Sequence, residues 1–209
     1  MTRSPTNTRE KLIETAKDLI WQNSYGHVSV DDICKAAQVH KGSFYHYFPS
    51  KIDLTLAVLD SYYTYSKPFF DEIFNADMPP KERFGRLAKF GYEKQKEAKE
   101  KYGRVCGCPF MALGSEMGGY EQAISDKINT VVKENQKYYS GAIEDMIALG
   151  ELPKDTDVKA KASQIHAYVV GHIMLARVQN SLEPLRDNLV EGIFDILGVS
   201  EKQKHKEYA

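Results

Sequence analysis

The stretch that decides the fold is Ser29–Leu54, which reads SVDDICKAAQVHKGSFYHYFPSKIDL. Ser29 precedes Asp32 by three residues, and this spacing lets a hydroxyl and a carboxylate satisfy the unpaired backbone amides at the start of a helix. The polar break Gln38–His40 then leads into a second short segment, Lys41–Tyr47. The pattern predicts two short helices joined by a tight turn, which is a helix-turn-helix.

The second segment is dense in aromatic, hydroxyl and basic side chains. Phe44 and Phe48 lie four residues apart, and aromatic residues at helical spacing are more often part of a core than of a contact surface. The neighbouring side chains point to other faces, where they offer hydrogen-bond donors and a positive charge suited to phosphates and base edges. These neighbours are Lys41, Ser43, Tyr45 and His46. We therefore expect the two phenylalanines to anchor the segment and its other side chains to contact DNA.

The same stretch resembles the DNA-binding motif of the TetR family of repressors. In that family a Gly, a Ser or Thr, an aliphatic residue or Phe, and then a run of aromatic residues and His precede a Lys on the next helix. The matching residues here are Gly42-Ser43-Phe44-Tyr45-His46-Tyr47-Phe48 and Lys51, preceded by Ile33 and Ala36-Ala37. The resemblance implies an all-α protein in which three N-terminal helices bind DNA and the remaining helices bind a ligand and form a dimer.

The resemblance also implies which residues contact the operator. The full set is Ser29, His40, Lys41, Gly42, Ser43, Tyr45, His46, Tyr47 and Lys51. Within this set Lys51 and Tyr45 contact phosphates, while Lys41, Ser43 and His46 lie nearest the bases.

Three members of this set need a separate argument. The family often has a phosphate-contacting His at the position of Tyr47, so the role of Tyr47 stays open. Lys51 lies in the first turn of a helix, where the helix dipole disfavours a cation unless a phosphate binds there. Gly42 destabilises a helix, so we expect its backbone to approach DNA or the turn closely.

Composition is that of a globular protein with little net charge. Of the 209 residues, 42% are hydrophobic and 27% are charged, and the formal net charge is −1. A chain of this length can bury a substantial core. Its net charge does not by itself indicate a protein that binds nucleic acid. No apolar run approaches the length of a membrane span, and Met1–Arg9 is polar rather than a signal peptide. We therefore expect a cytoplasmic protein with no membrane association.

Apolar residues recur every three to four positions along most of the chain, which predicts about nine helices and no strands. After a disordered arm at residues 1–7, the predicted helices lie at 7–23, 30–37, 41–47, 50–67, 80–101, 109–117, 121–149, 155–180 and 184–197. Pro68 should end or kink the fourth of these helices, and the charge run Glu93–Lys101 should fray the fifth. The expected domains are residues 1–50 for DNA binding, residues 51–200 for ligand binding and dimerisation, and a disordered tail at 201–209.

The larger domain supplies candidates for an effector pocket and for a dimer interface. The candidate effector contacts are Tyr92, Cys106, Cys108, Phe110, Met111, Met117, Tyr168, His172, Met174 and Arg177, most of which we expect to be core. Asp155–Asn180 and Pro184–Leu197 carry more apolar positions than one packed face requires, and by the resemblance they pair with their copies in a homodimer. A two-fold dimer presents two recognition helices to a pseudo-palindromic operator. The segment Lys51–Lys67 can act as a lever by which an effector changes their spacing.

Cys106 and Cys108 support two alternatives. As a redox or nucleophilic pair they would suit an enzyme, but no phosphate loop, nucleophile elbow or metal-ligand spacing accompanies them, so we expect no catalytic residue, cofactor or metal. As sensors they would suit a regulator that responds to oxidants or electrophiles, as some TetR-family members do with cysteines in this region. Pro109 makes Cys108 the N-cap of a helix, where the dipole and Arg104 favour the thiolate. The simpler explanation is that both are small buried apolar residues.

Overall fold

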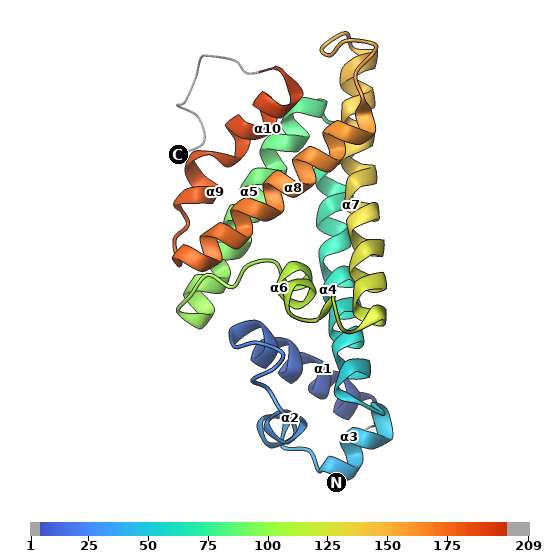
Figure 1. The fold of residues 1–209 in the computed structure, drawn as a ribbon, viewed down its shortest axis with the longest axis vertical. Helices are drawn as coiled ribbons and strands as arrows, with labels where there is room; N and C mark the ends of the chain where they lie inside the picture. The colour runs from blue at the N-terminus through green and yellow to red at the C-terminus, as the bar shows by residue number, and fades with distance from the viewer. Residues whose placement is uncertain (1–4, 200–209) are drawn as a thin grey trace. The chain divides into compact units, whose positions relative to one another are not determined.

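The computed structural model describes residues 5–199, which form ten α-helices and no β-strand (Figure 1). Packing divides these residues into two compact units. The first contains the residues up to Pro68 together with Cys108–Val131, and the second contains Phe69–Gly107 together with the residues from Val132 onward. The prediction of an all-α fold is confirmed, with one helix more than expected.

Three helices form the N-terminal part of the first unit: α1 Pro5–Gln22, α2 Val30–Ala37 and α3 Lys41–Tyr47. Most of the apolar residues expected in their core are buried, and these are Leu12, Ile13, Ala16, Ile20, Ile33, Ala37, Phe44 and Phe48. Leu19 and Val30 are partly exposed. The predicted limits of α2 and α3 are confirmed. The first helix begins at Pro5, so it includes the end of the predicted arm at residues 1–7; the rest of that arm and the predicted tail at 201–209 lie outside the described residues.

Ser29 and Asp32 form the predicted capping box at the start of α2. The Ser29 hydroxyl oxygen accepts a hydrogen bond from the Asp32 backbone N–H at 3.1 Å, and the Asp32 carboxylate accepts one from the Ser29 backbone N–H at 2.9 Å. At the other end Gln38 takes a left-handed conformation with φ 52°, and its N–H bonds to carbonyls of the last turn. Both ends of this short helix therefore have their exposed backbone groups satisfied.

The fourth helix, α4 Lys51–Ile73, continues through Pro68. Of the two outcomes that the sequence predicted at this proline, an end of the helix at Lys67 is therefore wrong. A proline in a helix interior removes one backbone hydrogen bond and costs roughly 3 kcal/mol. The turn beyond it stays helical because Ile73 is buried and Phe70 and Phe74 pack against the core of the second unit. Burial of this apolar turn outweighs the unfavourable effect of the proline.

The fifth helix, α5 Pro80–Tyr102, begins at the predicted proline. The prediction that Glu93–Lys101 frays is wrong, because the helix continues through it and buries Gln95 and Ala98. The Gln95 side chain accepts a hydrogen bond from the Gly107 N–H at 2.8 Å and donates one to the Gly107 carbonyl at 3.2 Å. A polar side chain within the charge run therefore holds the loop that follows α5.

The predicted limits of α6 Pro109–Met117 are confirmed, and α7 Gln122–Ala148 and α8 Val158–Gln179 match their predictions with small shifts at the ends. Buried residues of α5, α7, α8 and the last helices make the core of the second unit, including Phe84, Leu87, Tyr139, Ile143, Met146, Ile165, Leu189 and Ile193. Among the helices of residues 5–199, none has both the length and the apolar character that crossing a bilayer requires.

The predicted helix Pro184–Leu197 is two helices, α9 Glu183–Asp187 and α10 Leu189–Leu197. They are separated at Asn188, whose φ of −126° and ψ of −13° lie outside the helical range. Asparagine leaves helical geometry easily because its side chain competes for backbone hydrogen bonds. The Tyr168 hydroxyl of α8 donates to the Asn188 carbonyl at 3.0 Å and so fixes the break against a neighbouring helix.

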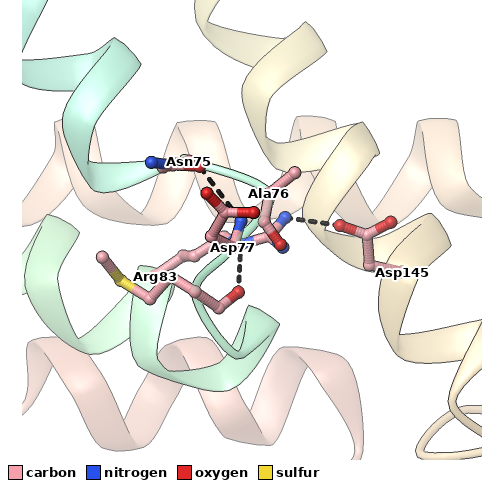
Figure 2. A network of polar contacts seen from close by, with 6 residues as sticks. Asn75, Ala76, Asp77, Arg83 and Asp145 are labelled. Atoms are coloured by element: carbon pink, nitrogen blue, oxygen red, sulfur yellow. Dashed lines mark hydrogen bonds and ion pairs between the residues drawn. The ribbon is translucent and has the colours of Figure 1, made fainter.

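Arg83 is 4% exposed and joins three segments of the second unit (Figure 2). Its guanidinium donates to the Asp145 carboxylate of α7 at 2.6 Å, to the Met78 carbonyl at 2.9 Å and to the Ala76 carbonyl at 3.1 Å. A buried guanidinium is tolerated only when its donors find acceptors. The contacts therefore tie the connection between α4 and α5 to α7.

Replacing Arg83 tests whether this buried cation stabilises the second unit. Arg83→Met keeps an apolar stem but leaves the Met78 and Ala76 carbonyls without their donor, so we expect the free energy of unfolding to fall by about 2–3 kcal/mol in a denaturant titration. Lys81→Met is the control, because Lys81 Nζ lies 3.9 Å from Glu151 Oε2 in a more exposed ion pair. This substitution should change the free energy of unfolding by less than about 0.5 kcal/mol. Equal effects of the two substitutions would contradict the assignment.

Candidate nucleic-acid interface

Two buried aromatic side chains anchor α3, and the rest of the helix faces solvent. Phe44 is 0% exposed and Phe48, which caps the helix C-terminus, is 3% exposed. Their ring centroids lie 6.1 Å apart, and their predicted place in the core is confirmed. The other predicted DNA contacts of this segment are exposed or partly exposed, and these are His40, Lys41, Gly42, Ser43, Tyr45, His46 and Tyr47.

Lys41 opens α3 and pairs with a carboxylate of the preceding helix. Its ammonium lies 2.8 Å from the Asp31 carboxylate, and both side chains are exposed. The hydrogen bond to Asp31, with the charge of that carboxylate, raises the pKa of Lys41. Exposed ion pairs contribute little to stability, so the ammonium can transfer to a phosphate or a base edge at small expense.

Ser29 and His40 flank the helices of the motif in different ways. The Ser29 hydroxyl donates to the Asp32 carboxylate at 2.5 Å, so the capping box already uses this proton. His40 is the N-cap residue of α3, and its carbonyl accepts from the Ser43 and Phe44 N–H groups at 2.9 and 3.1 Å while its imidazole makes no capping hydrogen bond. The His40 ring is therefore available to an external partner, whereas Ser29 would have to use its oxygen as an acceptor.

Lys51 begins α4, as predicted, but its ammonium contacts the protein itself. It donates to the Tyr25 carbonyl and lies 3.7 Å from the centroid of the Tyr25 ring. Burial lowers the pKa of Lys51. A phosphate contact by this side chain stays a prediction, and it would have to replace the contact with Tyr25 or share the ammonium with it.

Gly42 lies in the first turn of α3 with open space around it. A Cβ built there meets no heavy atom within 4 Å among the described residues. Of the two explanations that the sequence allowed, a close approach to the turn is therefore wrong. A close approach to DNA stays a prediction.

The predicted effector contacts are divided between the two units. Six of them belong to the second unit, namely Tyr92, Cys106, Tyr168, His172, Met174 and Arg177. Cys108, Phe110, Met111 and Met117 belong to the first. In the first unit Phe110 is buried, and its ring lies edge-on to Tyr62 of α4 with centroids 5.6 Å apart. In the second unit Tyr92 packs against the core.

Tyr168 and His172, one turn apart on α8, are brought together by that helix. Their ring centroids lie 4.1 Å apart, and His172 Nδ1 is 3.0 Å from the Tyr168 carbonyl. The Tyr168 ring also covers Gly192 of α10, where a Cβ would lie 2.0 Å from the Tyr168 hydroxyl oxygen. These contacts give Tyr168 a packing role between α8 and α10, whatever else it contacts.

The loop that carries Cys106 is held firmly from several sides. Arg177 of α8 donates to the Cys106 carbonyl at 2.8 Å, and the Asn180 side chain accepts from the Val105 N–H at 2.9 Å. At Gly107, φ is +77° and a Cβ would lie 2.8 Å from Arg177 Cδ, so glycine is required there. The loop therefore owes its shape to side chains of α5 and α8.

The expectation that the helix dipole and Arg104 favour the thiolate of Cys108 is wrong, because the pKa of that thiol is raised. The pKa of the Cys106 thiol is raised as well. Cys106 is 1% exposed, and its burial raises the pKa of its thiol although the charges of Arg104 and Arg177 oppose this. Burial also raises the pKa of Cys108, more than the backbone amides of Met111 and Phe110 lower it. Cys108 is the N-cap residue of α6, as predicted, but burial disfavours the thiolate at both cysteines. The simpler explanation, a small buried residue, fits Cys106, whereas Cys108 is partly exposed.

Comparison with known proteins assigns the family. The sequence model described as bacterial regulatory proteins, tetR family, matches residues 12–58, and the model described as tetracyclin repressor-like, C-terminal domain, matches residues 91–190. The transcriptional regulator AcuR of Cereibacter sphaeroides is 32% identical over 180 residues, which cover 84% of this chain and 79% of that protein. The chain belongs to the TetR family. It is a DNA-binding transcriptional regulator of that family.

Other TetR-family proteins resemble the chain over nearly its whole length. The HTH-type transcriptional repressor NemR of Escherichia coli K12 is 25% identical over 184 residues, or 88% of this chain and 90% of NemR. The crystal structure of the regulatory protein TetR from Rhodobacter sphaeroides superposes with a TM-score of 0.76 at 29% identity, covering 90% of this chain and 96% of that one. These relatives are named as regulators or repressors, which is consistent with a protein that is not an enzyme.

Two features of this TetR-family chain were missed by reasoning from its sequence. Glu116 of α6 binds the backbone of Tyr25 and Gly26, and no local pattern indicates such a contact between distant segments. His166 of α8 has both ring nitrogens buried with no hydrogen-bond partner among the described residues, and burial lowers its pKa. A histidine at an inward position of an apolar helix was the available signal for the second feature.

Substituting Gly42 separates its effect on stability from its effect on DNA. Because a Cβ meets nothing there, Gly42→Ala should leave the melting temperature unchanged or raise it, consistent with a gain of up to about 1 kcal/mol in helix propensity. If DNA approaches the Gly42 backbone, the same change should weaken binding to a duplex selected by the wild-type protein. Gly85→Ala is the matched control, since a Cβ also meets nothing at Gly85 in α5. Equal DNA affinity of both variants would contradict the close approach.

Proposed function

We propose that this TetR-family regulator acts in the cytoplasm as a homodimeric repressor, which a small-molecule effector bound in the C-terminal domain releases from a pseudo-palindromic operator. The observation that carries the proposal is the outer surface of α3. Phe44 and Phe48 are buried while Lys41, Tyr45 and His46 are exposed. A short helix held in this way can enter a major groove with its polar side chains directed at the base edges.

We propose for individual residues the roles that the family resemblance implies. Lys41, Ser43 and His46 read base edges, and Tyr45 and Lys51 contact phosphates. The proposed interface is completed by Ser29, His40, Gly42 and Tyr47. In domain terms, residues 1–50 bind DNA and residues 51–200 bind the effector and form the dimer.

An apolar strip on α8 supports the homodimer. Leu175 is 43% exposed and Val178 is 80% exposed. Gly171, one turn before Leu175, is also exposed and has open space where a Cβ would lie. These positions share one face of the helix, and packing against a second copy would remove the strip from water. In such a dimer the two α3 helices would lie about 34–36 Å, or a multiple of that distance, apart.

Control by an effector requires that it bind one arrangement of the DNA-binding helices better than another. The candidate contacts remain Tyr92, Cys106, Cys108, Phe110, Met111, Met117, Tyr168 and His172. We propose α4 as the lever, since this continuous helix runs from Lys51 beside the DNA-binding helices to Ile73 in the core of the second unit. Pro68, which removes one hydrogen bond from the helix, is its weak point.

A non-covalent, largely apolar effector is favoured over a thiol switch. A sensor that used Cys106 or Cys108 would need a thiolate that reagents can reach. Burial raises the pKa of both thiols, and Cys106 is enclosed in a loop with fixed geometry. Thiol sensing is therefore the second candidate for how this regulator responds.

Selection of DNA from a random pool tests the function. The wild-type protein should enrich a pseudo-palindromic site, and Lys41→Ala or Ser43→Ala should change the preference among variants of that site. Tyr45→Phe should weaken binding to all variants by a similar factor, on the order of tenfold, because it removes one hydrogen bond to a charged phosphate. Lys154→Ala, an exposed lysine between α7 and α8, should have no effect. A wild-type protein that enriches no sequence would disprove the proposed function.

Charge placed on the α8 strip tests the dimer. Leu175→Asp and Val178→Asp should shift sedimentation at micromolar concentration from dimer to monomer, because each buries a carboxylate in the interface. Both variants should also lose tight operator binding, since one recognition helix contacts too few base pairs. Leu149 lies just beyond α7 and is 65% exposed. The Leu149→Asp variant should therefore remain a dimer. Sedimentation of the wild-type protein as a monomer would contradict the proposal.

A further inference from the structure

A carboxylate of α6 holds the turn between α1 and α2. Glu116 accepts one hydrogen bond from the Tyr25 N–H at 3.0 Å and one from the Gly26 N–H at 2.6 Å. Hydrogen bonds from two adjacent amides to one carboxylate belong to the stronger, charge-assisted kind and fix orientation as well as distance. All three residues belong to the first unit, so this contact joins α6 to the DNA-binding helices within one compact body.

Gly26 allows the carboxylate to come this close. A Cβ at this position would lie 3.1 Å from Glu116 Oε1, which is tighter than an ordinary contact and would displace the carboxylate by a few tenths of an ångström. Alanine at position 26 therefore disturbs the contact while leaving the charge of Glu116 in place.

The same turn holds Lys51 on its other side. The Lys51 ammonium donates to the Tyr25 carbonyl and lies over the Tyr25 ring. A cation at this position gains from the carbonyl and from the face of the ring. Only Phe48–Ser50 separates Lys51 from the end of α3, so the place of Lys51 constrains the recognition helix.

We propose that Glu116 is a positioning residue for DNA binding, which acts through the Tyr25–Gly26 turn and Lys51 so that a displacement of α6 changes the affinity of α3 for DNA. The inference rests on the proposed function, because that function makes α3 the recognition helix and places effector contacts on α6. Phe110, Met111 and Met117 are the candidate contacts that share α6 with Glu116. An effector that moves α6 would therefore change the hydrogen bonds between Glu116 and the Tyr25–Gly26 turn.

The chemistry of the contact indicates the direction of the effect. Without Glu116 the two amides bond to water instead, and the turn loses the group that orients it. Lys51 then loses a fixed partner, and α3 must be ordered when DNA binds. Ordering at the moment of binding weakens affinity, so release of Glu116 lowers DNA affinity.

The test measures binding and local stability on the full chain. Binding is followed by fluorescence anisotropy with a duplex that the wild-type protein selects from random DNA, and local opening is followed by amide hydrogen exchange. Glu116→Ala should weaken binding about tenfold and speed exchange both in residues 22–30 and in residues 41–54. Gly26→Ala should do the same to a smaller extent, and Glu116→Gln, which keeps an acceptor oxygen, should restore part of the loss.

Two controls distinguish positioning from charge and from general destabilisation. Glu121→Gln removes another negative charge that acts on Tyr25 without removing the hydrogen bonds of Glu116 to the turn, so its affinity should stay within about twofold of wild type. Combining Glu116→Ala with Lys51→Met should weaken binding by less than the product of the single effects, because the two side chains act through one turn.

Several results would overturn the inference. These are a loss of less than twofold for Glu116→Ala, an equal loss for Glu121→Gln, or faster exchange confined to residues 22–30. If Glu116→Ala fails to fold, Gly26→Ala and Glu116→Gln decide the same question. If the wild-type protein selects no DNA, the proposed function fails, and exchange in residues 41–54 still shows whether Glu116 controls the recognition helix.

Discussion

Burial of Phe44 and Phe48 is the constraint on which the DNA-binding unit depends. A helix of seven residues is too short to be stable by itself, so α3 exists because these two rings leave water. Burying each ring contributes about 1.5–3 kcal/mol, and it also fixes the rotation of the helix about its axis. Once that rotation is set, the side chains between the rings face outward, and this outer face is the surface that we propose reads DNA.

The cations of this surface already have partners within the protein. Lys41 pairs with Asp31, and Lys51 contacts Tyr25. DNA must compete with these contacts, and the whole chain offers almost no net charge to favour it. In the proposed complex, general electrostatic attraction to DNA would be small, and tight binding would depend on matched contacts at a particular sequence. Partnered cations thus favour discrimination over non-specific binding.

Polar side chains fix the geometry of two loops, as the two aromatic rings fix the rotation of α3. Arg83 ties the connection between α4 and α5 to α7, and Gln95 with Arg177 shapes the loop that carries Cys106. The Arg83 guanidinium and the Gln95 amide are buried and have to satisfy their hydrogen bonds, so each of them fixes the loop that it contacts. Arg177 is only partly buried and adds a further hydrogen bond to the second loop. Cys106 is buried as a result of that geometry, and burial raises the pKa of its thiol. Its neighbours in the sequence did not reveal this burial.

The sequence by itself determined the features that depend on a few consecutive residues: the Ser29–Asp32 cap, the limits of α2, α3 and α6, the stripes that form the core, and the family motif. Caps, turns and helical stripes act over about four residues, so local order is enough to read them. Only the tertiary structure decided that α4 passes through Pro68, that the last helix breaks at Asn188, and that Lys51 and Glu116 meet at one turn. In these cases residues far apart in the chain supply the packing or the hydrogen bonds, and their energy exceeds the local preference.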